Sequence, residues 1–213
     1  MNRTYFKAVR ADGTDFYTGK VRWLPDDGAP IPAGGWVVEH PTSERVGDDA
    51  RTYLSVSTVE TDCAGMGWPC RLLRVVPDGR QVSIPEPVGL PSTRASIRWR
   101  VIEELPAWQA LGPQGREIEA LLGQVESLTE DQTLEMSAAR GFARGFARDV
   151  ARFAALVASR GGALNAAQGG ALGTALNAVR DAVLGWLVKD FISDEEFRTL
   201  VGPWEQVMGR VIA

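Results

Sequence analysis

The chain has 213 residues and weighs 23.1 kDa, a size that suits one large domain or two small ones. Hydrophobic residues make up 45% and charged residues 23%, which excludes wholesale disorder. The formal net charge of −4 gives no overall nucleic-acid signature. With one histidine and two cysteines, the composition also excludes a zinc enzyme built from several histidines.

The first residues lack the apolar core of a secretory signal, which predicts a cytoplasmic protein. Two cysteines, Cys63 and Cys70, do not make a disulfide scaffold, and whether they form a single bridge stays open. The longest uncharged run, residues 161–179, has the length of a membrane span. Its amides and glycines argue against insertion into lipid, so we expect no membrane span.

Residues 1–105 show the pattern of an antiparallel β-sheet, because runs rich in β-branched and aromatic residues alternate with turn signals. The expected strands are Thr4–Arg10, Val21–Leu24, Gly35–His40, Thr52–Thr58, Cys70–Val76, Gln81–Pro85 and Ala95–Glu103. Cys70–Val76 breaks the alternation of polar and apolar residues, which predicts burial on both faces and a central position.

From Pro106 onward the pattern becomes helical. An N-cap at Thr129 predicts a helix that reaches about Ser159, and a second helix should run from Ala163 or Gly170 to Phe191. Whether residues 161–173 form loop or helix stays open. The sequence therefore predicts an α+β protein: a β-rich domain over residues 1–105, then a helical domain rich in Ala, Arg and Gly over residues 106–213.

The end of the chain carries its own helix signals. Ser193-Asp194-Glu195-Glu196 is a capping box, which predicts the start of a short helix. Gly202-Pro203 predicts the end of that helix, because proline lacks the backbone N–H that the helix needs, and Trp204–Met208 can make one more turn.

The most distinctive local feature is a four-residue repeat over residues 139–152. Its arginines recur at i, i+4 spacing and would form a ridge on a helix: Arg140, Arg144, Arg148 and Arg152. The ridge predicts either contact with an anionic partner or, as we favour, a face paired with the acidic segments nearby. Gly141 and Gly145 would each cost about 1 kcal/mol inside a helix, which close packing against another helix would offset.

The hydroxyl-rich segment Leu54–Thr58 resembles the Ser-Thr-Ser strand of ADP-ribosyltransferases, although that residue order is absent. The resemblance implies that Arg10 binds the phosphates of NAD, Ser57 supports the nicotinamide ribose and Glu103 polarises the ribose 2′-hydroxyl. A carboxylate suits this role because it stabilises the positive charge that develops in the transition state.

The sequence predicts no metal site and no cofactor. His40, Asp62, Cys63 and Cys70 could supply mixed ligands, but six residues separate the cysteines and His40 is distant in sequence. Neither the P-loop pattern nor the dinucleotide-binding glycine pattern occurs.

Three stretches carry a second resemblance: Phe6–Phe16, then Tyr53–Thr58 with Thr61–Cys63, and Asp190–Trp204. Together with the Ala/Arg-rich middle, they resemble an uncharacterised conserved protein family of actinobacteria and their phages. The resemblance spans most of the chain and implies a bacterial cytoplasm and a phage-encoded origin. It implies no activity and assigns no functional residues.

These patterns lead to one expectation and two alternatives. We expect a non-enzymatic interaction or assembly protein, whose C-terminal helices mediate self-association or bind a host protein. The candidate contact residues are Arg140, Arg144, Arg148, Arg152, Gly141 and Gly145. The alternatives are an NAD-consuming transferase and a protein that binds nucleic acid through the arginine ridge.

Overall fold

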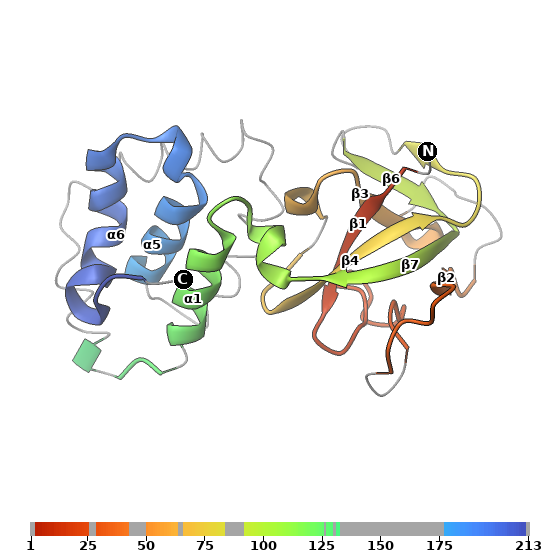
Figure 1. The fold of residues 1–213 in the computed structure, drawn as a ribbon, viewed down its shortest axis with the longest axis horizontal. Helices are drawn as coiled ribbons and strands as arrows, with labels where there is room; N and C mark the ends of the chain where they lie inside the picture. The colour runs from red at the N-terminus through yellow and green to blue at the C-terminus, as the bar shows by residue number, and fades with distance from the viewer. Residues whose placement is uncertain are drawn as a thin grey trace. The chain divides into compact units, whose positions relative to one another are not determined.

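A computed structural model describes residues 3–25, 29–42, 50–63, 66–83, 92–125, 127–129, 131–132 and 177–211. The chain divides into two compact units, Met1–Ala110 and Leu111–Ala213 (Figure 1). A sheet forms the first unit and helices form the second, so the predicted α+β class is confirmed. The predicted helix from Thr129 to Ser159 lies almost entirely outside the described residues, as does the segment 161–173.

In the described part of the first unit, seven strands form one antiparallel sheet in the order β2-β7-β4-β1-β3-β6-β5. Their bounds are β1 Tyr5–Arg10, β2 Trp36–Glu39, β3 Leu54–Ser57, β4 Cys70–Pro77, β5 Val82–Ser83, β6 Thr93–Ser96 and β7 Arg98–Leu105. Leu72 and Leu73 on β4 point to opposite faces and are both fully buried. The central position predicted for this strand is therefore confirmed.

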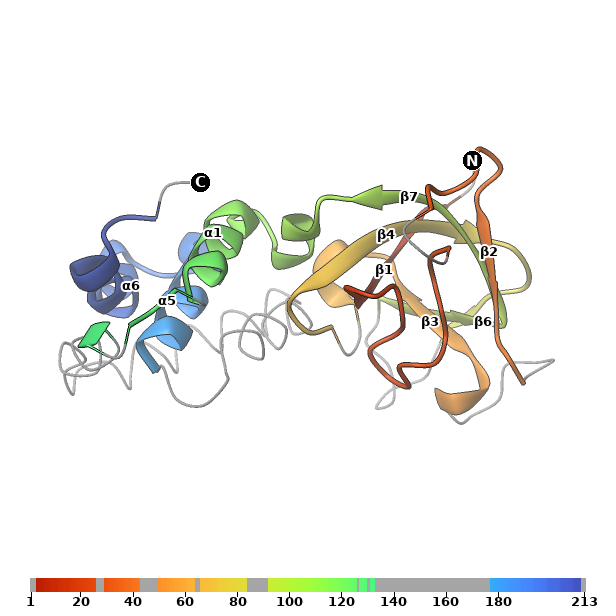
Figure 2. The same cartoon turned by 90° about the horizontal axis from the view of Figure 1, so that it is seen from below.

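One predicted strand, Ala95–Glu103, is two strands in the structure, with a break at Ile97. β6 pairs with β3 and β5, whereas β7 pairs with β2 and β4. Figure 2 shows β7 and β4 on one side of the unit and β3 and β6 on the other. The chain therefore bends at Ile97, so that β6 belongs to one flank of a curled sheet and β7 to the other.

The inner face of the curled sheet carries the core of the first unit. Its buried members are Tyr5, Val9, Trp23, Leu24, Val38, Leu54, Val56, Leu73, Val75, Trp99 and Val101. The rings of Tyr5 and Trp99 meet edge to face, with centroids 5.3 Å apart. Burial of these aromatic and β-branched side chains is what stabilises the curvature.

The predicted strand Val21–Leu24 is wrong, because this segment makes only an isolated bridge between Thr14 and Arg22. The carboxylate of Asp15 accepts the N–H of Val21 at 2.9 Å, a donor that a neighbouring strand would otherwise use. Trp23 and Leu24 are both buried, so the segment also lacks the alternation of a strand with one solvent-facing side.

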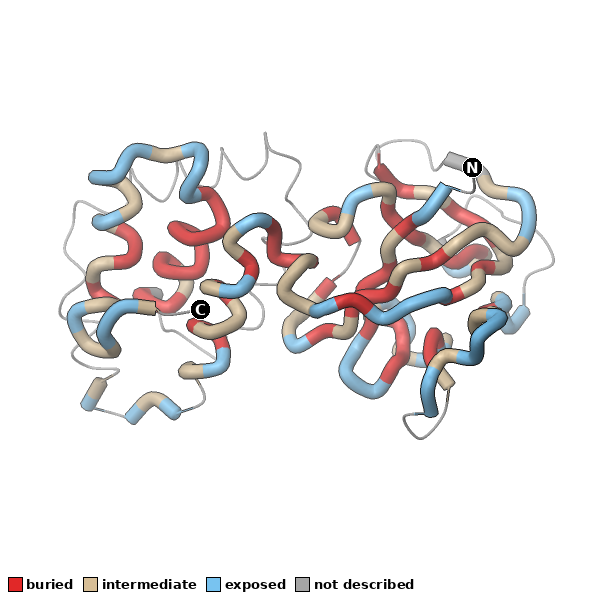
Figure 3. The backbone as a smooth tube through the Cα atoms, viewed as in Figure 1, coloured by how far each residue is buried: buried red, intermediate tan, exposed pale blue. Residues whose placement is uncertain are grey.

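Three longer helices appear in the described part of the second unit: α1 (Gly115–Val125), α5 (Asn177–Leu187) and α6 (Asp194–Met208). Short 3-10 turns occur along the described chain. In the first unit they are η2 (Ala50–Thr52) and η3 (Glu60–Asp62), and later in the chain they are η4 (Ala107–Leu111) and η5 (Lys189–Phe191). α5 packs against both α1 and α6, and its residues from Ala178 onward are buried except for Arg180 (Figure 3). No helix among the described residues is long and apolar enough to cross a membrane.

Helix α6 begins as predicted but ends later than predicted. Ser193 Oγ accepts the N–H of Glu196, and Glu196 Oε2 accepts the N–H of Ser193, so the capping box is confirmed. The predicted end at Gly202-Pro203 is wrong, since the helix continues to Met208. Pro203 removes one backbone hydrogen bond, but it is buried beside the fully buried Trp204. Burying an indole ring outweighs that loss.

Helix α5 lies close against α6 at Gly185. A Cβ atom at this position would lie 2.9 Å from Val201 Cγ2 and 3.1 Å from Leu200 Cβ. These distances are shorter than ordinary van der Waals contact between carbon atoms. Only glycine therefore allows this approach of the two helices.

Candidate functional site

The residues predicted to contact a partner lie outside the described residues. This applies to all six of them: Arg140, Arg144, Arg148, Arg152, Gly141 and Gly145. Their role stays a prediction, and the described candidates belong to the sheet unit.

The structure spreads the three residues implied by the transferase resemblance over the sheet. Phe6 on β1 lies opposite both Ser57 and Arg74, and Arg74 lies opposite Glu103. Ser57 and Glu103 are thus level with each other but three strand spacings apart, about 14 Å along the sheet. Arg10 lies four residues beyond Phe6 on β1, about 13 Å along the strand. The backbone positions do not bring the three side chains around one ribose.

Glu103 and Ser57 also have structural partners. Glu103 accepts a hydrogen bond from the guanidinium of Arg74 across β4 and β7, and Glu104 forms a bidentate pair with Arg71 beside it. Ser57 is buried, and its Oγ accepts the N–H of Val59 at 3.1 Å. Sequence patterns could not reveal these partners, because the cross-strand register selects them.

The residues considered for a mixed metal site do not form one. Among the described residues, no group of three or more His, Cys, Asp or Glu side chains is placed to hold a metal ion. Cys63 and Cys70 are both buried and free, so the question of a bridge is answered in favour of two thiols. Burial raises the pKa of the Cys63 thiol to about 12, although the charge of Lys7 and a hydrogen bond from the Ala8 backbone lower it. Cys63 is therefore an unreactive, structural thiol.

Two buried charged groups are unpredicted features of the sheet unit. Lys7 lies on the inner face of β1, with its Nζ 5.1 Å from the ring centre of Trp23, and burial lowers its pKa. Asp62, at 3% exposure, accepts a 2.9 Å hydrogen bond from Ser92 Oγ, and burial raises its pKa. Its Oδ1 has no hydrogen-bond partner within the described part of the chain. Period-two spacing from Tyr5 would have predicted that Lys7 points inward, whereas nothing local marks Asp62.

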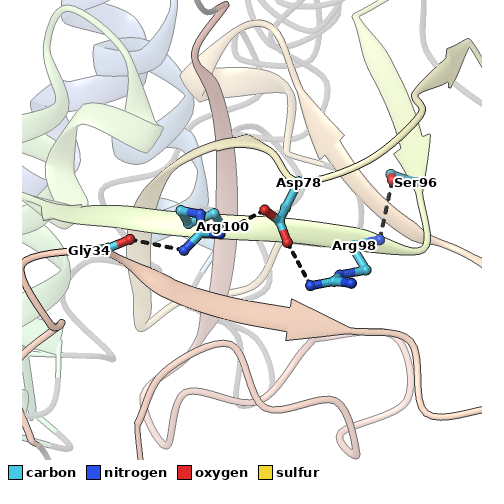
Figure 4. A network of polar contacts seen from close by, with 5 residues as sticks. All are labelled: Gly34, Asp78, Ser96, Arg98 and Arg100. Atoms are coloured by element: carbon cyan, nitrogen blue, oxygen red, sulfur yellow. Dashed lines mark hydrogen bonds and ion pairs between the residues drawn. The ribbon is translucent and has the colours of Figure 1, made fainter.

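A polar network that joins two strands centres on Asp78 (Figure 4). Asp78 follows β4, and its two carboxylate oxygens bind Arg100 at 2.8 Å and Arg98 at 2.9 Å. Arg100 also donates to the carbonyl of Gly34 at 3.0 Å, which ties the segment before β2 to β7. The bond from Arg100, with the charges of both arginines, lowers the pKa of Asp78. This network links β4, β7 and the segment before β2, and its one carboxylate offsets one of the two arginine charges.

The described residues thus form a curled antiparallel sheet with ion pairs between its strands, followed in the chain by a unit of packed helices. Comparison with known proteins finds no match among family models, curated proteins or solved structures. Function is therefore inferred from the contacts of the chain itself.

Proposed function

We propose that this chain is a non-enzymatic interaction protein, in which the sheet unit is a scaffold and the helical half contacts a second copy of the chain or another protein. The observation that carries the proposal is the packing at Gly185, where an added Cβ would lie 2.9 Å from Val201 Cγ2. A glycine inside a helix costs about 1 kcal/mol relative to alanine. In this helix the close approach of a neighbouring helix offsets that cost.

The same reasoning extends to the glycines that the sequence analysis singled out. Gly141 and Gly145 are four residues apart, a spacing that puts two residues on one face of a helix. We propose that this face admits a helix of a partner chain, with Arg140, Arg144, Arg148 and Arg152 beside it for contact with acidic side chains. The acidic segments of the chain itself make a second copy a suitable partner.

The partners of the candidate catalytic groups support a non-enzymatic role. Glu103 is held by Arg74, and Ser57 is buried against the N–H of Val59. Incubation with NAD checks this point directly, with wild type compared to Glu103→Gln. We expect no turnover by either protein. Turnover by wild type that Glu103→Gln abolishes would overturn the proposal in favour of the transferase.

Light scattering over a wide range of protein concentration tests the contact itself. We expect wild type to self-associate and the double variant Gly141→Leu/Gly145→Leu to stay monomeric. Gly123→Leu is the matched control, because nothing lies within 4 Å of an added Cβ at this position on α1. A wild-type protein that is monomeric at every concentration, and that captures no partner lost in the double variant, would contradict the proposal.

A further inference from the structure

Hydrogen bonds to one buried carboxylate, that of Asp15, hold the loop that follows β1. Asp15 accepts hydrogen bonds from the N–H and Oγ1 of Thr18 and from the N–H of Val21. The carbonyl of Asp15 also accepts the N–H of Gly19 at 3.1 Å. These bonds fix the residues on both sides of Tyr17, so the loop presents its exposed side chains from a rigid backbone.

The loop carries an exposed aromatic ring and two cationic side chains. Tyr17 is 66% exposed, more than any other large hydrophobic residue in the described part of the chain. The guanidinium of Arg10 crosses the same loop, because its Nη2 donates to the carbonyl of Phe16 at 3.4 Å. Gly19, with φ of +66°, makes room for it: a Cβ there would lie 3.0 Å from Arg10 Nη1. The exposed Lys20 follows directly.

The charges of this loop differ from those on β4 and β7. Arg71 and Arg74 each form an ion pair with a glutamate of β7, and Arg98 and Arg100 share the carboxylate of Asp78. Neither Arg10 nor Lys20 has a carboxylate within 4 Å among the residues that the structure describes. The nearby Asp12 accepts hydrogen bonds from the N–H and hydroxyl of Thr14, and these bonds, followed by the charges of Arg10 and Arg22, lower its pKa, so it stays ionised. Residues 10–22 carry three cationic side chains, Arg10, Lys20 and Arg22, against the carboxylates of Asp12 and Asp15, so the loop keeps one net positive charge, with Arg10 and Lys20 exposed.

We infer that Arg10, Tyr17 and Lys20 form a binding site for single-stranded nucleic acid. Tyr17 stacks on an unpaired base, and Arg10 and Lys20 contact the phosphates on either side of it. Because hydrogen bonds to Asp15 hold the backbone of the loop, little backbone entropy is lost on binding. An acidic peptide would satisfy the two cations but would leave the ring of Tyr17 without a stacking partner, so nucleic acid is the better fit.

Fluorescence anisotropy with a labelled oligothymidylate, at low and at moderate salt, tests the site on the full chain. We expect Tyr17→Ala to weaken binding by about fivefold or more, the effect of losing one stacked base. Tyr17→Phe should bind like wild type, because it keeps the ring. Arg10→Gln and Lys20→Gln should each reduce the dependence of log affinity on log salt concentration by about 0.7.

Arg74→Gln is the matched control, because it removes the same charge from an arginine that is already paired with Glu103. We expect it to leave affinity within about twofold of wild type, well below the effect of one phosphate contact. The inference is overturned if Tyr17→Ala binds as tightly as wild type, or if Arg74→Gln weakens binding as much as Arg10→Gln. Binding lost only in Arg144→Gln/Arg148→Gln, or a preference for polyglutamate over the oligonucleotide, would also overturn it.

Discussion

The indole N–H of Trp99 on β7 donates a 3.0 Å hydrogen bond to the carbonyl of Leu54 on β3. In the sheet, β4 and β1 separate these two strands. The bond therefore crosses the interior of the first unit rather than running along the sheet, which requires the sheet to curl. Since Trp99 is fully buried, its ring and its N–H together hold the two flanks at a fixed separation.

Replacing Trp99 by phenylalanine should lower the free energy of unfolding by about 2–4 kcal/mol, because it removes buried ring volume and the hydrogen bond to the carbonyl of Leu54. Urea denaturation followed by circular dichroism measures this loss. Trp23→Phe is the control, because Trp23 is equally buried but its N–H has no partner among the described residues. Equal losses in the two variants would show that the cross-sheet bond contributes nothing.

Two glycines in helices should respond in opposite directions to the same substitution. Gly185→Ala should destabilise the protein by about 1–3 kcal/mol, because the added methyl group overlaps Val201. Gly123→Ala should stabilise it by about 0.5–1 kcal/mol, because the site is open and alanine favours the helix. Thermal unfolding of both variants measures the two signs, and a stabilised Gly185→Ala protein would refute the close packing of α5 and α6.

The buried carboxyl of Asp62 should make stability fall as pH rises. Burial raises its pKa above the ordinary 3.8, so the folded state holds the proton more tightly than the unfolded state. The stability that comes from this tighter proton binding is fully present below the ordinary pKa and is lost as pH increases through the raised value. Asp62→Asn should therefore gain stability relative to wild type as pH rises from about 4 to 7.

Asp15→Asn is the control for that experiment, because the contribution of Asp15 to stability should change with pH in the opposite direction. Burial raises the pKa of Asp15, but the hydrogen bonds from Thr18 and Val21 together outweigh this effect and lower it. Its contribution to stability is present above the ordinary pKa and lost in acid. Urea midpoints at several pH values measure both variants, and parallel profiles for the two would contradict the contrast.

The thiol of Cys63 should be almost inert in the folded protein. A pKa of about 12, against an ordinary 9.0, lowers the thiolate fraction about a thousandfold at neutral pH. Iodoacetamide labelling of a Cys70→Ser variant, read by mass spectrometry, isolates this residue. We expect slow labelling in buffer and fast labelling in urea; equal rates in both would show that the thiol is accessible.

Period-two patterns predicted the positions of most strands, and they failed where tertiary structure overrides local sequence. The alternation of residues continues through Ile97, so nothing local marks the break between β6 and β7. The run Val21–Leu24 has strand-like composition, but Asp15, six residues earlier, takes the N–H of Val21. At Pro203 the local signal for a helix end is real, but burial of Trp204 outweighs it.

The functional residues were harder to predict than the strands. Glu103 has the chemistry of a catalytic acid, and only the register of β4 and β7 shows that its carboxylate forms an ion pair with Arg74. Likewise, Arg10 approaches the loop of Tyr17 where Gly19 has no Cβ, a proximity that composition and spacing do not report.

The bend at Ile97 has a consequence for how the sheet unit opens. Because one continuous segment supplies β6 to one flank and β7 to the other, neither flank can detach without disturbing its counterpart. Amide protons in these two strands would then exchange with solvent in a single event, at a free energy close to that of global unfolding. We therefore expect the two flanks of the sheet to open cooperatively, as one unit.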